Sequence, residues 1–340
     1  MGVKDMKVFE KMTELQPCKD LVRAFYAALD GAEGAAIPAV MAQFCAPNLR
    51  WRGYHPFGEL TGPESVATRF WSPLRRSITR LRRRPDIFFA GRNEIDRFQS
   101  VWVVAMGHLY GLLDQPWLGI APTGKMAFLR HAEFHRVEGG RIVETAMYFD
   151  IPHLMIQTGL APFASQRGAH LVQPGPATHD GLLTGPQPTA TGEATLALIN
   201  KMIGDIGQWN SGLTLEDELR RTWDEDMIWW GPAGIGATCT IERYAKQHSG
   251  PFRAAFSERA RTGHVARLAE GHYGGFFGWP NFSAVHSGPF LGFEATGRRC
   301  AFTVIDIYRR ASDRLVENWV FIDIPAFLDQ IGHPMVLEMP

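Results

Sequence analysis

The sequence lacks most features of extracellular, membrane-bound or cofactor-dependent proteins. It has no run of 18 apolar residues and no charged-then-apolar leader. Its four cysteines are scattered without CxxC spacing, which does not suit a disulfide framework or a zinc site. There is no P-loop, no GxGxxG after a strand and no GxSxG elbow. We therefore expect a cytoplasmic protein that needs no cofactor and binds neither metal nor membrane.

The sequence also has no excess of charge of either sign. Lysine plus arginine number 35, as do aspartate plus glutamate, so no net field attracts nucleic acid. The most basic segment is Arg-Leu-Arg-Arg-Arg at 80–84. Because no aromatic residues alternate with these arginines, we interpret the segment as a solvated surface. Large rings, in contrast, are abundant, with 10 Trp and 22 Phe. They suit an apolar ligand cavity and an ordinary core equally well.

The second half of the sequence repeats the first. Residues 123–160 align without a gap on residues 296–333, at an offset of 173. Further upstream the offset is 178, and His108 aligns there with His286. A period this long exceeds that of solenoid repeats, so we infer two copies of one domain.

Each copy begins with helices and continues with a run of strands. An amphipathic helix opens each copy, ending before Gly31 in the first and Gly207 in the second. Alternating apolar and polar residues follow, without the βαβ rhythm of a parallel sheet, which indicates an α+β fold. The predicted organisation is an N-terminal extension at 1–15, a first domain at 16–162, a Pro- and Gly-rich linker at 163–191, a second domain at 192–333 and a tail at 334–340. The proline spacing predicts an irregular linker.

The last hairpin of each copy separates two kinds of side chain by strand alternation. One face combines ionisable and aromatic groups and is expected to line a small-molecule pocket. The other is aliphatic, includes Val143 and Met147, or Ile305, Val316 and Val320, and is expected to pack against the other copy. We assign to the mixed face His131, Glu133, His135, Glu144, Tyr148 and Asp150 in the first copy, and Asp306, Tyr308, Glu317, Trp319, Phe321 and Asp323 in the second.

These hairpins carry motifs that resemble the SnoaL-like polyketide cyclases of the nuclear-transport-factor-2-like superfamily. The first copy has Thr-Gly-Lys at 123–125, Gly-Arg-Ile-Val-Glu at 140–144 and the spaced residues Asp150, Leu154, Gln157 and Gly159. The second has Thr-Gly-Arg at 296–298 and the spaced residues Asp323, Phe327, Gln330 and Gly332. The resemblance implies cone-shaped α+β barrels around an apolar pocket. In a tandem chain the two copies would form an intrachain pseudo-dimer.

The resemblance also implies an aldol-type cyclisation of a hydrophobic, polyketide-like carbonyl compound, without metal or cofactor. A carboxylate would act as acid and base, and we predict Asp323 with His286 in the second copy and Asp150 with His108 in the first. The predicted substrate-binding residues are Trp319, Phe321, Tyr308, Tyr148, Glu317, Glu144, His131 and Glu133.

Structural roles compete with each of these assignments. Asp150 and Asp323 precede Ile-Pro and could cap a helix, Glu144 and Glu317 could bridge an arginine, and the two histidines could be satisfied core residues. A metal site formed by His131, Glu133 and His135 is disfavoured, because the second copy has no equivalent triad. The alternative functions are a non-catalytic binding module, or an isomerase, hydratase or hydrolase that uses the same pocket.

Overall fold

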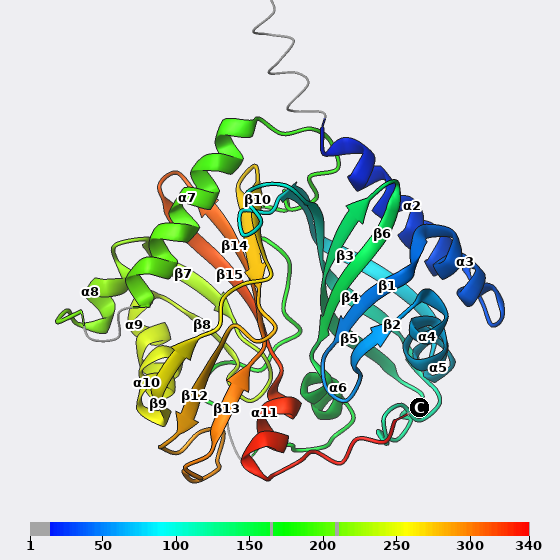
Figure 1. Cartoon of the computed structure of the whole chain (residues 1–340). Helices are drawn as coiled ribbons and strands as arrows, with labels where there is room; N and C mark the ends of the chain where they lie inside the picture. The colour runs from blue at the N-terminus through cyan, green and yellow to red at the C-terminus, as the bar shows by residue number, and fades with distance from the viewer. Residues whose placement is uncertain (1–13, 164–165, 208–210, 340) are drawn as a thin grey trace, which may run out of the picture.

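The computed structural model describes residues 14–163, 166–207 and 211–339. The predicted N-terminal extension therefore lies, up to residue 13, outside the described residues, as does Pro340 of the predicted tail. Two halves, each with a curved sheet, lie side by side, with most helices on the outer sides and the sheets toward the middle (Figure 1).

The first half packs most of its helices on one face of a six-stranded sheet. Its helical segments are α2 (Gln16–Gly31), α3 (Ala36–Phe44), α4 (Pro63–Val66), η1 (Ala67–Trp71), α5 (Ser72–Ser77) and α6 (Ile151–Gln157). Its strands are β1 (Cys45–Gly53), β2 (Gly58–Thr61), β3 (Ile78–Arg92), β4 (Val101–Leu113), β5 (Met126–Glu138) and β6 (Arg141–Phe149). The strand order is β2-β1-β6-β5-β4-β3, in which only β1 and β6 pair in parallel.

The second half repeats this arrangement with shorter strands. Its helical segments are α7 (Thr189–Ile206), α8 (Leu215–Leu219), α9 (Ile241–Tyr244), η2 (Ala245–Ser249), α10 (Gly250–Ala255) and α11 (Ile324–Ile331). Its strands are β7 (Trp223–Trp230), β8 (Ala237–Cys239), β9 (Phe256–Arg261), β10 (Ala266–Glu270), β11 (Tyr273–Phe277), β12 (Phe282–His286), β13 (Arg299–Phe302), β14 (Val304–Ala311) and β15 (Arg314–Ile322).

Strand order is the same in both halves. The larger sheet of the second half runs β10-β11-β14-β15-β7-β8, and β13, β12 and β9 continue its broken strands as a second, three-stranded sheet. The predicted α+β class with two copies of one domain is therefore confirmed. The described sheets are open at their edges, so each cone-shaped barrel takes the form of a curved sheet covered by helices.

Each half has a β-bulge beside its last turn. The bulge changes which side chains of the two hairpin strands share a face of the sheet. The register shifts between Arg136 and Val137 in the first half, and between Arg309 and Arg310 in the second. As a result Glu133 lies opposite Met147, and Asp306 lies opposite Val320. A shift of one residue moves one strand's side chains to the other face relative to its partner. The assignment of His131, Glu133 and His135 to the face of Glu144, and of Asp306 and Tyr308 to the face of Glu317, was therefore wrong.

The two sheets pack against each other through the face expected to form the pocket. Phe277 of β11 contacts the rings of Trp102, Phe134 and Tyr148 of the first half, at centroid distances of 5.4, 5.1 and 6.1 Å. The guanidinium of Arg130 lies 4.0 Å from the ring centroid of Phe321 and donates to the carbonyl oxygens of two second-half residues. The intrachain pseudo-dimer is thus present. The faces assigned to it were wrong. Met147 shares a face with Glu133, and Val320 shares a face with Asp306 in a cavity of the second half, whereas Ile305 lies in a core that includes residues of both halves.

The segment between the halves has no regular element among its described residues until α7 begins at Thr189, as the proline spacing predicts. It nevertheless makes specific contacts with both halves. The backbone of Phe88 exchanges hydrogen bonds with Gly181 and Leu183, and the indole of Trp319 donates to the carbonyl oxygen of Pro174. The segment therefore acts as a strap along the interface.

None of the helices in the described part of the chain is both long enough and apolar enough to span a membrane.

Candidate functional site

A cavity of about 260 Å³ lies inside the second half, between the concave face of the sheet and helices α7, α8, η2 and α10. Rings dominate its wall. They come from Trp223, Trp229, Tyr244, Phe252, Phe276, Phe282, Phe302 and Tyr308. Walls of this kind exclude water and suit a planar, largely apolar ligand.

One carboxyl group, that of Asp306 on β14, projects from the sheet into this cavity. The carboxyl accepts a hydrogen bond of 3.4 Å from the Asn318 amide, and the same amide donates at 3.0 Å to a backbone carbonyl. Burial among the rings raises the pKa of Asp306 to about 7. A carboxyl with such a pKa exchanges protons readily at neutral pH, as a general acid or base requires.

Two histidines also line the cavity, beside other polar groups that include Tyr244, Tyr308, Asn281, Asn318 and the arginines Arg253, Arg259, Arg261 and Arg267. The ring of His248 stacks on Trp229 and that of His264 stacks on Phe276, each with centroids 4.0 Å apart. Burial lowers the pKa of both imidazoles to about 3, so both are neutral at physiological pH. The Nδ1 atom of each is buried without a hydrogen-bond partner among the described residues. These rings are therefore able to donate to, or accept from, a ligand.

The first half uses the equivalent strand position differently. Asp306 corresponds to Glu133 at the offset of 173. Glu133 is buried, with its carboxylate 2.6 Å from Nη1 of Arg83 and 3.0 Å from Nε2 of His135. Burial by itself would raise the pKa of Glu133, but the Arg83 guanidinium and the histidines hold it well below its usual range. This carboxylate is locked in its ionised form.

The predicted catalytic aspartates serve as helix caps that join the two halves. Asp150 accepts from the amide of His153 at 3.0 Å in its own half and from that of Ala233 at 2.9 Å in the other. Asp323 does the same with Ala326, at 3.1 Å, and His55, at 2.9 Å.

The two caps follow the internal symmetry of the chain. His55 and Ala233 are themselves equivalent at the offset of 178, so the contacts form a symmetric pair. Burial raises the pKa of Asp323 to about 7, although both amide donors favour its ionised form. The capping alternative therefore describes the contacts of both residues.

The predicted catalytic histidines pair with other groups. His108 Nδ1 lies 3.2 Å from the carboxylate of Asp86, and His286 Nδ1 lies 3.2 Å from the hydroxyl of Thr296. Neither these histidines nor the two capping aspartates line the cavity. The expected Asp–His pairs are thus not formed in this structure.

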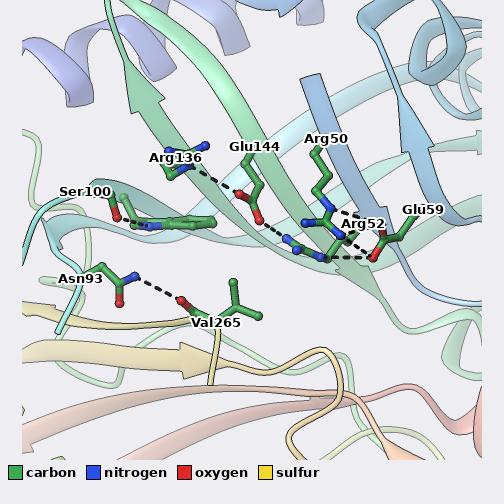
Figure 2. A network of polar contacts seen from close by, with 9 residues as sticks. Arg50, Arg52, Glu59, Asn93, Ser100, Arg136, Glu144 and Val265 are labelled. Atoms are coloured by element: carbon green, nitrogen blue, oxygen red, sulfur yellow. Dashed lines mark hydrogen bonds and ion pairs between the residues drawn. The ribbon is translucent and has the colours of Figure 1, made fainter. Parts of the chain in front are cut away.

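The predicted binding glutamates bridge arginines, as the structural alternative expects. Figure 2 shows Glu144 between Arg52 and Arg136, with Arg50 and Glu59 extending the network. Glu317 likewise lies 2.6 Å from Nε of Arg309.

Most of the other predicted binding residues also lie away from the cavity. Trp319, Phe321 and Tyr148 belong to the core shared by the halves, and His131 lies beside Glu133. Among the predicted binding residues, Tyr308 lines the cavity. The sequence reasoning placed Asp306 on the face of Glu317, which the structure contradicts, and did not include it among the site residues. The repeat held a usable signal, because Asp306 and Glu133 put a carboxyl at one strand position in both copies.

Comparison with known proteins assigns both halves to one family. The profile of the SnoaL-like polyketide cyclases matches residues 209–331, and that of the SnoaL-like domain matches residues 22–145. Together the two matches cover most of the chain, which is therefore a two-copy member of the SnoaL-like family. A search of curated proteins found no match.

Solved structures resemble a single half of the chain. A proposed SnoaL-like polyketide cyclase from Jannaschia sp. CCS1 is 20% identical and covers 43% of this chain and 94% of its own, with a TM-score of 0.35. IdmH, a proposed polyketide cyclase from Streptomyces antibioticus, is 19% identical over 43% of this chain and 99% of its own, with a TM-score of 0.35. An NTF2-like protein from Burkholderia xenovorans LB400 is 12% identical over 42% and 98%, with a TM-score of 0.33.

Proposed function

We propose that the second half is a cofactor-independent enzyme that acts on a hydrophobic carbonyl compound by aldol-type cyclase or lyase chemistry, with Asp306 as acid and base. The observation that carries the proposal is a carboxyl with a pKa of about 7 in a cavity walled largely by rings, where it is the one carboxyl among the lining residues. The family to which the chain belongs supports a cyclase-like role.

The chemistry follows from the placement of this group. A C–H bond beside or between carbonyls is already acidic, so a carboxylate of raised basicity is able to remove its proton. The enolate then attacks a second carbonyl carbon of the same molecule, and the new alkoxide takes a proton from the acid form of Asp306. The neutral His248 and His264 are available to hydrogen-bond the carbonyl oxygens, while the Tyr308 hydroxyl hydrogen-bonds the carboxyl of Asp306.

The difference between the halves supports one active cavity in place of two. Glu133 is held by an arginine, so its basicity is low, whereas the arginine equivalent to Arg83 in the second half, Arg261, donates instead to the carbonyl oxygen of Ile203 at 2.9 Å. Arginines also line the cavity of Asp306, but burial and not an arginine dominates the pKa of this carboxyl. We therefore assign proton transfer to the second half and none to Glu133.

Proton exchange tests this assignment without knowledge of the natural substrate. Hydrophobic 1,3-diketones and β-keto esters are incubated with the protein in D₂O, and loss of the acidic proton is followed by NMR. We expect Asp306→Asn to slow catalysed exchange about 10²–10⁴-fold, the usual contribution of a general acid or base. Asp313→Asn, the same change on the exposed turn of the same hairpin, is the control and should leave the rate unchanged.

Two outcomes would contradict the proposal. Equal exchange by the folded Asp306→Asn variant and the parent chain would remove Asp306 from the chemistry. Tight binding of these compounds with no exchange above the buffer rate, in either protein, would support a binding module.

A further inference from the structure

We infer that the first half carries a second, separate site, which binds a small molecule through a phosphate or carboxylate group. The site is a crevice of about 1070 Å³ between the end of α2, the start of α3, helix α5 and the start of β3. Five arginines line it, Arg75, Arg76, Arg80, Arg82 and Arg83, against two carboxylates, those of Asp30 and Glu33. The crevice is therefore strongly cationic in a chain of zero net charge.

Arg83 forms a rigid, buried base for this crevice. Its side chain is only 5% exposed, although it belongs to the run at 80–84 that the sequence suggested was solvated. Glu133 holds its Nη1 atom at 2.6 Å, and its guanidinium lies 3.9 Å from the ring centroid of Tyr26. His131 and His135 fix Glu133 in turn. The arginine is thus positioned before any ligand arrives, which lowers the entropy lost on binding.

The guanidinium of Arg83 also has N–H donors without a hydrogen-bond acceptor in the described part of the chain. Its Nη2 atom is buried and has no hydrogen-bond partner among the described residues, and its Nε atom has only an ion-pair distance of 3.5 Å to Asp30. The Nη1 atom of Arg75 is likewise buried and unpartnered within the described chain, while its Nη2 atom donates to the carbonyl oxygen of Asp30. Buried donors without acceptors are costly unless a ligand supplies the acceptors. Planar guanidinium groups suit phosphate and carboxylate oxygens in particular.

The second half gives an internal comparison. The equivalents of Arg75 and Arg83 are Arg253 and Arg261 at the offset of 178. Arg253 is paired with both carboxylate oxygens of Glu218, at 3.0 and 2.9 Å, and Arg261 bonds a backbone carbonyl. Fold alone therefore does not require unfilled arginine donors at these positions. We assign them in the first half to an anionic ligand, whose body would lie against Tyr110, itself stacked on Phe128 with centroids 5.3 Å apart.

Isothermal titration calorimetry at low salt tests this site, with inorganic phosphate, pyrophosphate and citrate as separate probes. We expect one-to-one binding of at least one probe to the full chain. Preference for pyrophosphate would indicate a phosphate-bearing ligand, and preference for citrate a carboxylate-bearing one. Arg75→Gln and Arg83→Lys should each weaken that binding about tenfold or more, since each removes fork donors to an anion. Asp30→Asn should strengthen it by removing a competing carboxylate.

Arg84→Gln is the matched control. Arg84 belongs to the same basic run but does not line the crevice, and it pairs with Asp86 at 3.1 Å with its side chain 48% exposed. Its loss should change affinity less than twofold. Binding by none of the probes at millimolar concentration would overturn the inference, as would equal weakening by Arg84→Gln, which would indicate non-specific charge attraction. Circular dichroism and urea unfolding confirm that each variant is folded. Asp306→Asn should leave anion binding unchanged. A failure of the anion-binding inference can therefore be distinguished from a failure of the proposed enzyme activity.

Discussion

At the scale of single residues, the placement of Asp306 links activity to pH. Burial raises its pKa to about 7, so the carboxyl is protonated in the folded chain over a range where the unfolded chain is already ionised. Exchange of substrate protons needs the ionised form. The rate should therefore rise through pH 7, and Asp306→Asn should abolish that rise.

The same titration predicts how stability changes with pH. A pKa that is raised on folding contributes stability that is fully present below about pH 4 and is lost as pH rises through 7. Asp306→Asn, which resembles the neutral carboxyl, should match the parent chain near pH 4 and exceed its free energy of unfolding at pH 8, by up to about 4 kcal/mol. Urea unfolding at a series of pH values measures this difference. A difference that does not vary with pH would show that Asp306 is ionised throughout.

The two capping aspartates should matter for stability and not for proton transfer. Each accepts one amide hydrogen bond within its helix and one from the other half. We expect Asp150→Ala and Asp323→Ala each to lower the free energy of unfolding by about 2 kcal/mol, since a cap and a second buried amide lose their acceptor. Thr214→Ala removes an exposed cap that has no contact across the halves and should cost about 1 kcal/mol or less. Melting temperature and proton exchange, measured on the same samples, separate the two roles. Loss of exchange in a stable Asp323→Ala protein would restore the catalytic assignment.

At the scale of elements, breaks in the long strands distinguish the second half from the first. The side-chain oxygen of Asn281 lies at the break between β11 and β12 and accepts from the amides of Gly278 and Val304, at 3.0 and 2.8 Å. It replaces ladder hydrogen bonds that the continuous strands of the first half make to one another. Without it, the amide of Val304 would lose its acceptor, and that of Gly278 would keep only a hydrogen bond of 3.4 Å to the carbonyl oxygen of Val304.

Removal of the Asn281 side-chain oxygen should therefore lower the free energy of unfolding. We expect Asn281→Ala to lower the free energy of unfolding by about 2–3 kcal/mol, while Asn281→Asp, which keeps the oxygen, should recover most of the loss. Chemical denaturation gives the comparison. Near-equal stability of the alanine and aspartate variants would mean that water satisfies these amides.

At the scale of the whole molecule, a buried ion pair joins three parts of the chain. Lys19 of α2 lies 2.7 Å from Glu270 of β10, with side chains 0% and 5% exposed. The ammonium also donates to the carbonyl oxygens of Leu183 and Gly185 in the connecting strap, and Glu270 accepts from the amide of Ala90. All three donors of the lysine are thus used in holding the halves and the strap together.

Removing one partner of this ion pair should lower the free energy of unfolding more than replacing both partners. Lys19→Met leaves a buried carboxylate, so we expect a loss of about 3–5 kcal/mol, whereas the double variant Lys19→Met with Glu270→Gln should lose clearly less. Equilibrium urea unfolding of the single and double variants gives the coupling energy. Single variants within 1 kcal/mol of the parent chain would show that the halves are held by their apolar contact alone.

The sequence by itself determined the repeat, the α+β class and the irregular strap, because these depend on identities, periodicity and proline, all of which are local. It also determined which residues alternate within each strand. It did not determine which strand faces match, since an extra residue at Val143 and at Val316 shifts the register and exchanges the inner and outer faces. That shift places Asp306 in the cavity and Trp319 at the interface. Tertiary structure also decided the charge of two equivalent carboxyl groups. Arg83, from a strand that is not adjacent to β5, and two histidines keep Glu133 ionised. Burial among rings leaves Asp306 able to exchange its proton at neutral pH.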